Sequence, residues 1–243
     1  MTDPRIPTVV HAFTALMAED ASRPLITFYD DQTGERVELS GATLGNWVAK
    51  TANLLVDGLG LGPGQVAAVR LPPHWQTAAV LLGCWSAGLT VDMVGGATAV
   101  VAFVTTSDEP FPVADETFAL SLAPLGLPFR AGPPSGTHDF TIEVRRYGDQ
   151  MPTIAAAPSQ AALLDGGTHA ELIANGLARA LPRSSRILID GDADADPRSW
   201  LVAPLVAGAS IVLCRHLDRA LLASRLVAEK AGLYASTKEA RGD

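Results

Sequence analysis

The sequence predicts an α/β protein built as two pseudo-repeated βα lobes with mostly parallel sheets. Three observations support this fold class. Segments with apolar residues at helical spacing alternate with short apolar strands, which is the order found in parallel sheets covered by helices. The 243 residues are 48% hydrophobic and only 18% charged, so a substantial apolar core is expected. The two halves of the chain also resemble each other in the order of their elements.

The first half begins with a helix and a pair of strands. Residues Val9–Ala21 carry apolar side chains at helical spacing. Residues 25–29 and 36–39 predict two strands joined by the turn sequence DDQTG. Ser40 is placed to cap the next helix, which ends at the glycine-rich run 58–64.

The next elements are apolar enough to raise the question of a membrane span. The stretch Leu71–Val91 contains no Asp, Glu, Lys or Arg, but Pro72 and Pro73 interrupt its start and Asp92 follows its end. A buried helix followed by a buried strand explains this pattern better, and we expect no membrane span. The predicted elements here are a strand at 65–71, a helix at 74–87, and strands at 89–94 and 99–104.

The middle of the chain is harder to interpret. Residues 107–158 are rich in Pro and Gly, and their short periodic segments suggest helices at Ala114–Leu122 and Phe140–Tyr147. From Gly166 the alternation of helices and strands resumes. The predicted elements are a helix at 168–181, a strand at 186–190, a helix at 197–206, a strand at 209–213 and a helix at 218–231.

The internal repeat suggests a division into lobes. Thr43 corresponds to Thr168 and Gly88 to Gly208, with a helix, a strand and a second helix in the same order between them. We expect a first α/β lobe at 1–110, a Pro/Gly-rich connecting region at 111–158 and a second, truncated α/β lobe at 159–243. A single compact domain is the alternative.

Charge and cysteine content narrow the function classes. The formal net charge of −8 would repel nucleic acid, so no nucleic-acid partner is expected. Cys84 and Cys214 are isolated in apolar surroundings, which favours buried free thiols in a reducing compartment. The N-terminal sequence MTDPRIPTVV lacks the features of a signal peptide. We therefore expect a cytoplasmic protein.

Metal binding is not expected. The aspartates of IDGDADADPRSW alternate, but a calcium-binding EF-hand loop starting at Asp190 would need Gly at its sixth and Glu at its twelfth position, where Ala195 and Leu201 stand. The simpler interpretation is a solvated loop in which Asp196 caps a helix that begins with Pro197. The histidines show no i, i+4 pair of the kind that binds zinc: His11, His74, His138, His169 and His216.

The sequence AALLDGGTHAELIAN, residues 161–175, places two glycines and a threonine before a helical pattern. Backbone N–H groups at a helix start attract anions, so Gly166, Gly167 and Thr168 are the candidate cofactor-binding residues. No lysine follows, and Thr168 could instead form a capping box with Glu171. Both interpretations stay open at this point. The lysines of the chain are Lys50, Lys230 and Lys238.

Four stretches together resemble the N-terminal part of acyl-CoA synthetases and related adenylate-forming ligases. They are LGLGPGQVAAV at 59–69, CWSAGLTV at 84–91, THAELIAN at 168–175 and APLVAGASIVL at 203–213. The resemblance covers nearly the whole chain in the order of that family. The chain length is also similar to that of a small actinobacterial group related to these ligases. The resemblance implies the fold of the N-terminal subdomains of acyl-CoA synthetases.

The same resemblance implies an altered nucleotide site. In the family, a Ser/Thr/Gly-rich loop ending in Pro-Lys-Gly precedes the Thr-His helix, whereas residues 157–167 contain no lysine and add Asp165. An aromatic residue or histidine near the family's acyl pocket is replaced by GDADAD at 191–196. The family's ribose-binding Asp and its lid domain with a catalytic Lys would lie beyond Asp243.

We therefore expect a non-catalytic relative of these ligases that acts as a small-molecule-binding or protein-interaction module. No catalytic residue and no cofactor are assigned, with ATP or AMP as the alternative cofactor. A homo-oligomer or a protein partner is the expected assembly. The alternative functions are a residual AMP- or acyl-binding protein that uses Gly166, Gly167 and Thr168, or an acid–AMP ligase that uses unusual residues.

Overall fold

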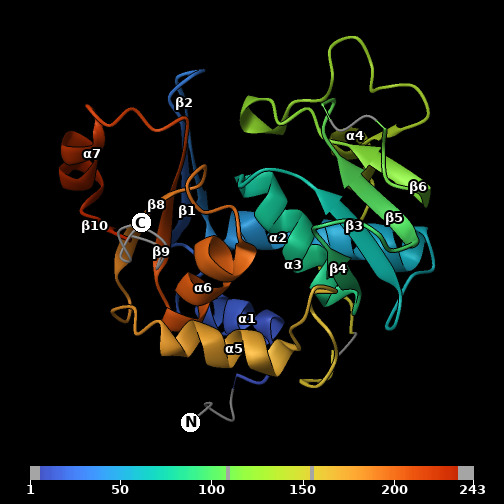
Figure 1. The fold of residues 1–243 in the computed structure, drawn as a ribbon, viewed down its shortest axis with the longest axis horizontal. Coiled ribbons are helices and arrows are strands. Elements are labelled where there is room, and N and C mark those ends of the chain that lie inside the picture. Colours follow the sequence, from blue (N-terminus) through green and yellow to red (C-terminus); the bar gives the residue numbers. More distant parts are fainter. Residues whose placement is uncertain (1–5, 108–109, 154–155, 235–243) are drawn as a thin grey trace. The chain divides into compact units, whose positions relative to one another are not determined.

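Helices and mostly parallel strands alternate along the chain and form two five-stranded sheets (Figure 1). The computed structural model describes residues 6–107, 110–153 and 156–234. The predicted α/β class is confirmed. Contacts divide the chain into two units, and neither unit is continuous in the sequence. The first unit comprises residues 1–42, 72–75 and 172–243, and the second comprises 43–71 and 76–171.

The first unit contains a mixed sheet. Its strands are β1 (Pro24–Asp30), β2 (Glu35–Ser40), β8 (Arg186–Asp190), β9 (Ser210–Arg215) and β10 (Gly232–Leu233), in the spatial order β10-β8-β9-β1-β2. The predicted hairpin is present, because β1 and β2 pair antiparallel, while the other pairs are parallel. Gly34 closes the hairpin turn at φ +75°, a conformation that glycine adopts at little cost.

Helices pack on both faces of this sheet. They are α1 (Val9–Asp20), α6 (Ala203–Ala207), which follows a π-helical turn at Arg198–Val202, and α7 (Leu222–Glu229). Figure 1 shows α7 on one side of β8 and β9 and α6 on the other. Leu222 and Leu226 of α7 pack against a buried cluster of Leu188, Val212 and Cys214.

A network of charged side chains lies between α7 and the sheet. Glu229, which is 9% exposed, accepts a hydrogen bond from the Tyr29 hydroxyl. Its carboxylate also pairs with the Nη2 atoms of Arg36 at 3.0 Å and of Arg186 at 2.6 Å. A nearly buried carboxylate is stable only when it is paired, so these donors fix α7 in place.

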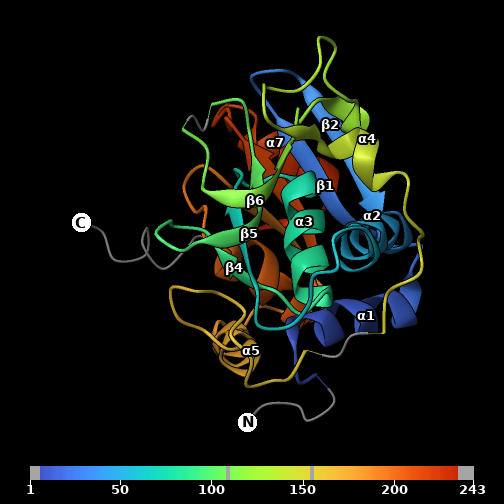
Figure 2. The ribbon, with the colours of Figure 1, turned by 90° about the vertical axis from the view of Figure 1, so that its right-hand side faces the viewer.

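The second unit contains an all-parallel sheet. Its strands are β3 (Val66–Arg70), β4 (Thr90–Asp92), β5 (Ala99–Val104), β6 (Ala114–Ala119) and β7 (His138–Asp139), in the order β4-β3-β5-β6-β7. The helices are α2 (Gly41–Asn53), α3 (Trp75–Ser86), α4 (Phe140–Val144) and α5 (His169–Ala178). The division between the units falls near the start of α2, near the start of α3 and within α5. Figure 2 shows α3 alongside the sheet. Phe103 of β5 contacts Phe118 and Phe140, with ring centroids 5.8 Å apart in both pairs.

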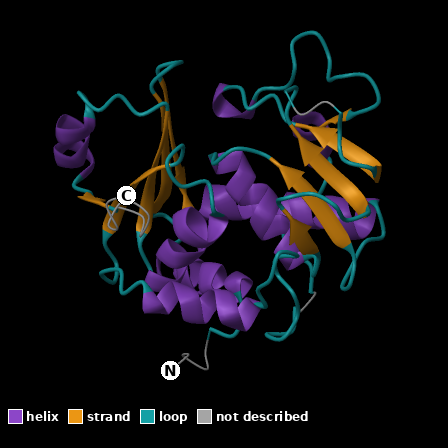
Figure 3. Cartoon of the chain, in the orientation of Figure 1, coloured by secondary structure: helices purple, strands orange, loops and turns teal. Residues whose placement is uncertain are grey.

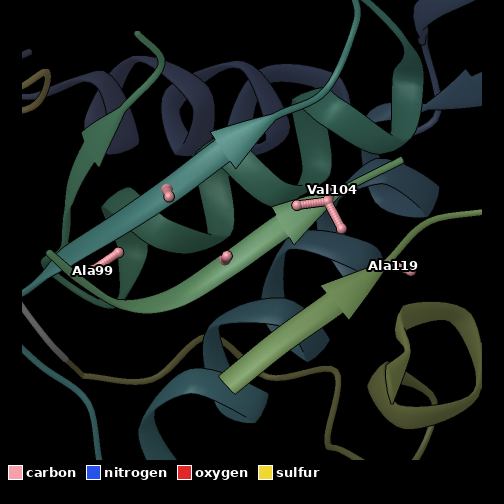
Figure 4. Packing of buried hydrophobic residues seen from close by; sticks show 5 residues of the cluster. Ala99, Val104 and Ala119 are labelled. Carbon is pink, nitrogen blue, oxygen red and sulfur yellow. The ribbon is translucent and has the colours of Figure 1, made fainter. Parts of the chain in front are cut away.

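The other face of this sheet carries small side chains. The buried cluster consists of Ala68, Ala99, Ala102, Val104 and Ala119 (Figure 4). Phe111 and Phe129, which are partly buried and lie in loops, pack against it. The described residues between β4 and β5 and between β5 and β6 contain no helix (Figure 3). Loops rather than helices therefore cover this face.

The internal repeat is visible in the structure. Gly88 lies between α3 and β4 at φ +78°, and Gly208 lies between α6 and β9 at φ +70°. Both end a helix in the left-handed conformation that favours glycine. The strand registers also match, since Val66 pairs with Thr90 in one unit and Arg186 with Ser210 in the other.

The structure corrects the sequence-based expectation for the segment at 114–122. The helix predicted at Ala114–Leu122 is wrong, because residues 114–119 form β6, which pairs along its length with β5. The division into lobes at 1–110 and 159–243 with a connecting region at 111–158 stays a prediction. The N-terminal hairpin joins the sheet of β8 and β9, and residues of the expected connecting region 111–158 supply β6, β7 and α4 to the other sheet.

The helix predicted at 74–87 is confirmed as α3. In the described ranges of the chain, none of the helices has both the length and the apolar character needed to cross a membrane.

Candidate functional site

The loop before α5 brings the three predicted site residues together. Gly166 and Gly167 adopt φ angles of +103° and +146°, and Thr168 directly precedes the helix. These φ angles let the chain fold back on itself. As a result, the amides of Ala162 and Leu163 donate to the Gly167 carbonyl at 2.9 and 3.2 Å. The loop is therefore a tight, internally bonded turn.

This loop is also attached to the edge of the parallel sheet. The Val91 amide of β4 donates to the Ala162 carbonyl at 3.0 Å, and the Leu164 amide donates back to the Val91 carbonyl at 2.9 Å. The segment around Leu163 thus continues the sheet beyond β4, its outermost strand. Such pairing protects a sheet edge that would otherwise expose unpaired backbone groups.

Side chains add further attachment points to the same loop. The indole nitrogen of Trp85 donates to the Ala162 carbonyl at 2.9 Å, and the hydroxyl of Thr90 donates to the Ala161 carbonyl at 2.9 Å. The side-chain amide of Gln160 donates to the Gly88 carbonyl. The loop is held by α3 and β4 rather than left free to close on a ligand.

The start of α5 is a capping box. The Thr168 amide and hydroxyl both donate to Glu171 Oε2, at 2.8 and 2.9 Å, and the Glu171 amide donates to the Thr168 hydroxyl at 3.2 Å. The capping interpretation of these two residues is confirmed. Hydrogen bonds from the Thr168 amide and hydroxyl lower the pKa of Glu171, so a carboxylate occupies this helix start.

The remaining amides at this helix start also have acceptors. The His169 amide donates to the Gln160 carbonyl at 3.1 Å, and the Ala170 amide donates to the Pro158 carbonyl at 2.9 Å. An anion at a helix start is normally bound by amides that have no other partner. Here the amides of residues 168–171 are all engaged within the chain.

A cavity lies at the carboxyl end of β3 and β4, where open parallel sheets usually bind ligands. Arg70 ends β3, and its guanidinium donates to the Asp92 carbonyl at 2.5 Å and to the Asp92 carboxylate at 3.2 Å. The cavity has a volume of about 610 Å³. We refer to it as the Arg70 cavity. Its lining residues are Arg70, Gly95, Gly96, Ala97, Thr98, Ser107, Pro110, Pro112 and Val113.

Local hydrogen bonds hold the ion pair of Arg70 and Asp92, which forms the polar side of the Arg70 cavity. Burial raises the pKa of Asp92, but hydrogen bonds from the amides of Gly95 and Val94 and the charge of Arg70 outweigh it, so the pKa is lowered. A Cβ atom on Gly95 would lie 3.3 Å from Arg70 Nη2, and the φ of Gly95 is +112°. Glycine at this position therefore lets the loop backbone approach the guanidinium.

Sequence patterns do not predict the Arg70 cavity. The only signal available was a charged residue at the end of each of two predicted strands. Their proximity depends on the register of β3 and β4, in which Ala68 pairs with Asp92. It also depends on a connection between β4 and β5, residues 93–98, that is too short for the helix usual in a parallel crossover.

The aspartate-rich segment after β8 is engaged in protein contacts. Asp190 accepts hydrogen bonds from the amides of Asp192 and Ala193 and pairs with Arg219 at 3.0 Å. Asp196 accepts from the Arg198 amide at 2.9 Å, as expected for a helix cap. Within the described part of the chain, no group of three or more His, Cys, Asp or Glu side chains is arranged to hold a metal ion.

Comparison with solved structures defines the class of fold. The chain is similar to an acyl-CoA synthetase from Brucella canis, with a TM-score of 0.70 and 17% identity over 93% of this chain and 46% of that one. It is similar to acetoacetyl-CoA synthetase from Streptomyces lividans, with a TM-score of 0.70 and 17% identity over 92% of this chain and 41% of that one. The chain thus spans less than half the length of these enzymes, and at this identity the likeness establishes the fold alone.

The match to the N-terminal domain of FACL13 from Mycobacterium tuberculosis locates the similarity within such enzymes. Its TM-score is 0.66, with 12% identity over 92% of this chain and 61% of that one. The two mostly parallel sheets are therefore similar in fold to the N-terminal domains of acyl-CoA synthetases.

A closer sequence relative identifies the family. A TIGR03089 family protein from Mycobacterium tuberculosis (strain ATCC 25618 / H37Rv) is 39% identical over 245 residues, covering 88% of this chain and 92% of the relative. The chain belongs to the TIGR03089 family. No family model matches the sequence.

Proposed function

We propose that this chain is a non-catalytic relative of the adenylate-forming ligases that binds a small molecule in the Arg70 cavity. The observation that carries the non-catalytic part of the proposal is the hydrogen bonding at the start of α5, where the amides of residues 168–171 all donate within the chain. A phosphate group there would have to displace these acceptors, including the carboxylate of Glu171. It would also find no lysine in residues 157–167.

The lining of the Arg70 cavity supports a ligand with a polar end and an apolar body. Arg70 and Asp92 form an ion pair at 3.2 Å, so the polar side offers hydrogen bonds without a net charge. Pro110, Pro112 and Val113 supply an apolar wall. Ligand sites commonly combine a mostly apolar lining with a few fixed polar groups.

The first test is for adenylate formation. The purified chain is incubated with ATP, magnesium and a broad panel of carboxylic acids, and pyrophosphate release is measured. We expect no release above a heat-denatured control. Pyrophosphate release with formation of an acyl-adenylate would overturn the non-catalytic assignment.

The second test is for binding in the Arg70 cavity. Small polar–apolar compounds are screened by ligand-observed NMR, and each hit is tested against Ala97→Trp, which places an indole in the cavity. The matched control is Ala131→Trp, in an exposed loop of the same unit. We expect Ala97→Trp to abolish binding and Ala131→Trp to preserve it. Equal binding by the two variants would contradict this location.

The alternative is residual nucleotide binding at Gly166, Gly167 and Thr168. Thermal-shift titrations with ATP, AMP, CoA and an acyl-adenylate analogue test it, because a ligand stabilises the folded state that it binds. A saturable rise for adenine ligands that Gly167→Val removes without unfolding the chain would support this alternative over our proposal. We expect no such rise.

We also propose a cytoplasmic location and association with a second copy or another protein. Cys84 and Cys214 are buried and unpaired, which supports a reducing compartment. Association is tested by measuring the molar mass of the purified chain by light scattering across a dilution series. A monomer at all concentrations without a co-purifying protein would contradict it.

A further inference from the structure

A second pocket in the same unit lies between α2 and the end of α4. Its lining residues are Thr43, Asn46, Trp47, Lys50 and Arg145, and its volume is about 210 Å³. Four of these five residues recur along one face of α2 at the spacing of helical turns, and Arg145 ends α4. We refer to it as the Lys50–Arg145 pocket.

Both cations of this pocket are held in place by backbone carbonyls. Lys50 Nζ donates to the Tyr147 carbonyl at 2.7 Å, and Arg145 Nη2 donates to the Gly126 carbonyl at 2.9 Å. One hydrogen bond each leaves most of their donors unused, since an ammonium has three N–H groups and a guanidinium has five. The cations are therefore positioned without being neutralised.

No carboxylate of the described residues forms an ion pair with either of these two charges. Among the residues that the structure describes, no Asp or Glu oxygen lies within 4.0 Å of Lys50 or Arg145. The neighbouring Arg146, in contrast, pairs with Glu143 at 2.7 Å. Two uncompensated cations around one pocket stand out in a chain with a formal net charge of −8. Their charges favour the binding of an anion in this pocket.

Trp47 supplies an apolar wall of fixed orientation. Its ring stacks on Phe140 with centroids 6.4 Å apart, and the guanidinium carbon of Arg145 lies 5.9 Å from the Trp47 ring. A cation over an indole face keeps its charge while its stem covers the ring. The pocket thus combines two positive charges, a flat apolar surface and the polar side chain of Asn46.

We propose that the Lys50–Arg145 pocket binds a small anion, namely a carboxylate or phosphate group carried by a compact molecule. Both groups accept charge-assisted hydrogen bonds from a lysine and an arginine at once. The volume admits a compact ligand and excludes a full nucleotide, whose size calls for a pocket of about 300 Å³ or more. This pocket and the Arg70 cavity have different lining residues, so the test of this proposal does not depend on the proposed function.

The experiment is calorimetric titration of the full chain with two probes, inorganic phosphate and benzoate, at low ionic strength. We expect saturable binding of at least one probe that weakens as salt is added. Lys50→Met and Arg145→Met each remove one charge while keeping an unbranched stem. Each should weaken binding by about tenfold or more, as expected for a lost charge-assisted hydrogen bond.

Arg146→Met is the matched control, because it removes the same charge from the adjacent position but from a residue paired with Glu143. It should change the affinity by less than about twofold, as surface charges outside a site usually do. Circular dichroism and melting curves confirm that each variant is folded. Binding of phosphate alone assigns the site to phosphate groups, and binding of benzoate alone assigns it to carboxylates on a flat body. Absence of saturable binding of both probes to the folded wild type, or equal effects of Arg145→Met and Arg146→Met, would overturn the proposal.

Discussion

The indole nitrogen of Trp85 donates a hydrogen bond to the main-chain carbonyl of Ala162, with 2.9 Å between the two atoms. This bond joins α3 to the loop that precedes α5. The resemblance to adenylate-forming ligases described above implies that this loop corresponds to their nucleotide loop. In this chain the loop is also attached to the sheet edge through Val91.

We expect Trp85→Phe to loosen this loop. The substitution removes one of the two donors to the buried Ala162 carbonyl, which keeps its hydrogen bond from the Val91 amide. It should therefore lower the free energy of unfolding by about 0.5–1.5 kcal/mol, as expected for one lost hydrogen bond. Urea unfolding measures the loss. Hydrogen exchange at the amides of residues 162–164 should also become faster, because their pairing depends on the position of the loop.

Trp200→Phe is the control for this prediction. Trp200 is also buried and donates to a backbone carbonyl, that of Ala195 at 3.2 Å, but it belongs to the first unit. Its replacement should lower stability without a selective change at residues 162–164. Equally fast exchange of these amides in both variants would contradict a specific role for Trp85.

The two repeat-related glycines should differ in their tolerance of a methyl group. Gly88→Ala and Gly208→Ala both force alanine into a left-handed conformation, at a cost of about 1–2 kcal/mol each. A Cβ atom on Gly88 would lie 2.9 Å from Pro63 Cγ, whereas the nearest atom to a Cβ on Gly208 is Leu16 Cδ2 at 3.6 Å. The close contact should add about 1–3 kcal/mol at Gly88. Urea midpoints compare the two variants, and equal losses would show that the Pro63 contact relaxes freely.

Acid should weaken the attachment of α7 through Glu229. Burial raises the pKa of Glu229, but hydrogen bonds from Tyr29, Arg186 and Arg36 outweigh it and bring the pKa from 4.5 to about 2. Because the folded-state pKa is depressed, this stabilisation is fully present above the unfolded value of 4.5. It is lost as the pH falls toward 2.

Glu229→Gln tests this dependence. The variant should be less stable than wild type at pH 7 by about 1–3 kcal/mol, and the difference should shrink below pH 4. Tyr29→Phe, which removes one of the three donors, should show a smaller pH dependence than wild type. A stability difference between wild type and Glu229→Gln that stays constant from pH 7 to pH 3 would rule out the proposed role of the carboxylate.

Ionisation of Glu35 should lower the stability of the fold, in contrast to ionisation of Glu229. Burial and the nearby charge of Asp30 raise the pKa of Glu35 from 4.5 to about 6. The folded state therefore binds this proton more tightly than the unfolded chain, and stability falls as the pH rises from 4.5 through 6. Glu35→Gln should then be more stable than wild type at pH 7 by up to about 1 kcal/mol, a figure reduced for solvent screening. Urea unfolding at pH 4 should show no such gain, and a gain of equal size at both pH values would exclude this explanation.

Local patterns predicted part of the candidate site. The spacing of Thr168 and Glu171 is that of a capping box, and the structure contains that box. The assignment of Gly166 and Gly167 as cofactor-binding residues stays a prediction, and in the structure both adopt positive φ angles in the turn before the helix. The bonds from Val91 and Trp85 to Ala162 were not predictable, because they join segments with no shared local pattern.

The strand at 114–119 shows how tertiary pairing overrides local preference. Its sequence ADETFA contains alanine and glutamate, which favour helices, and the periodicity suggested one. In the fold, Phe118 stacks on Phe103 and the segment pairs with β5, so hydrogen bonds and packing on the sheet decide its conformation.

By itself, the sequence determined the alternation of helices and strands, the internal repeat with its glycines at 88 and 208, and the lack of a lysine in residues 157–167. These features depend on local spacing and residue type. Only the tertiary structure decided that β1 pairs with β9, that Asp92 meets Arg70 and that Lys50 lies near Arg145 around one pocket. Each of these depends on which distant segments share a sheet or a helix face, and hydrophobic periodicity gives the face that an element buries but not the partner that covers it.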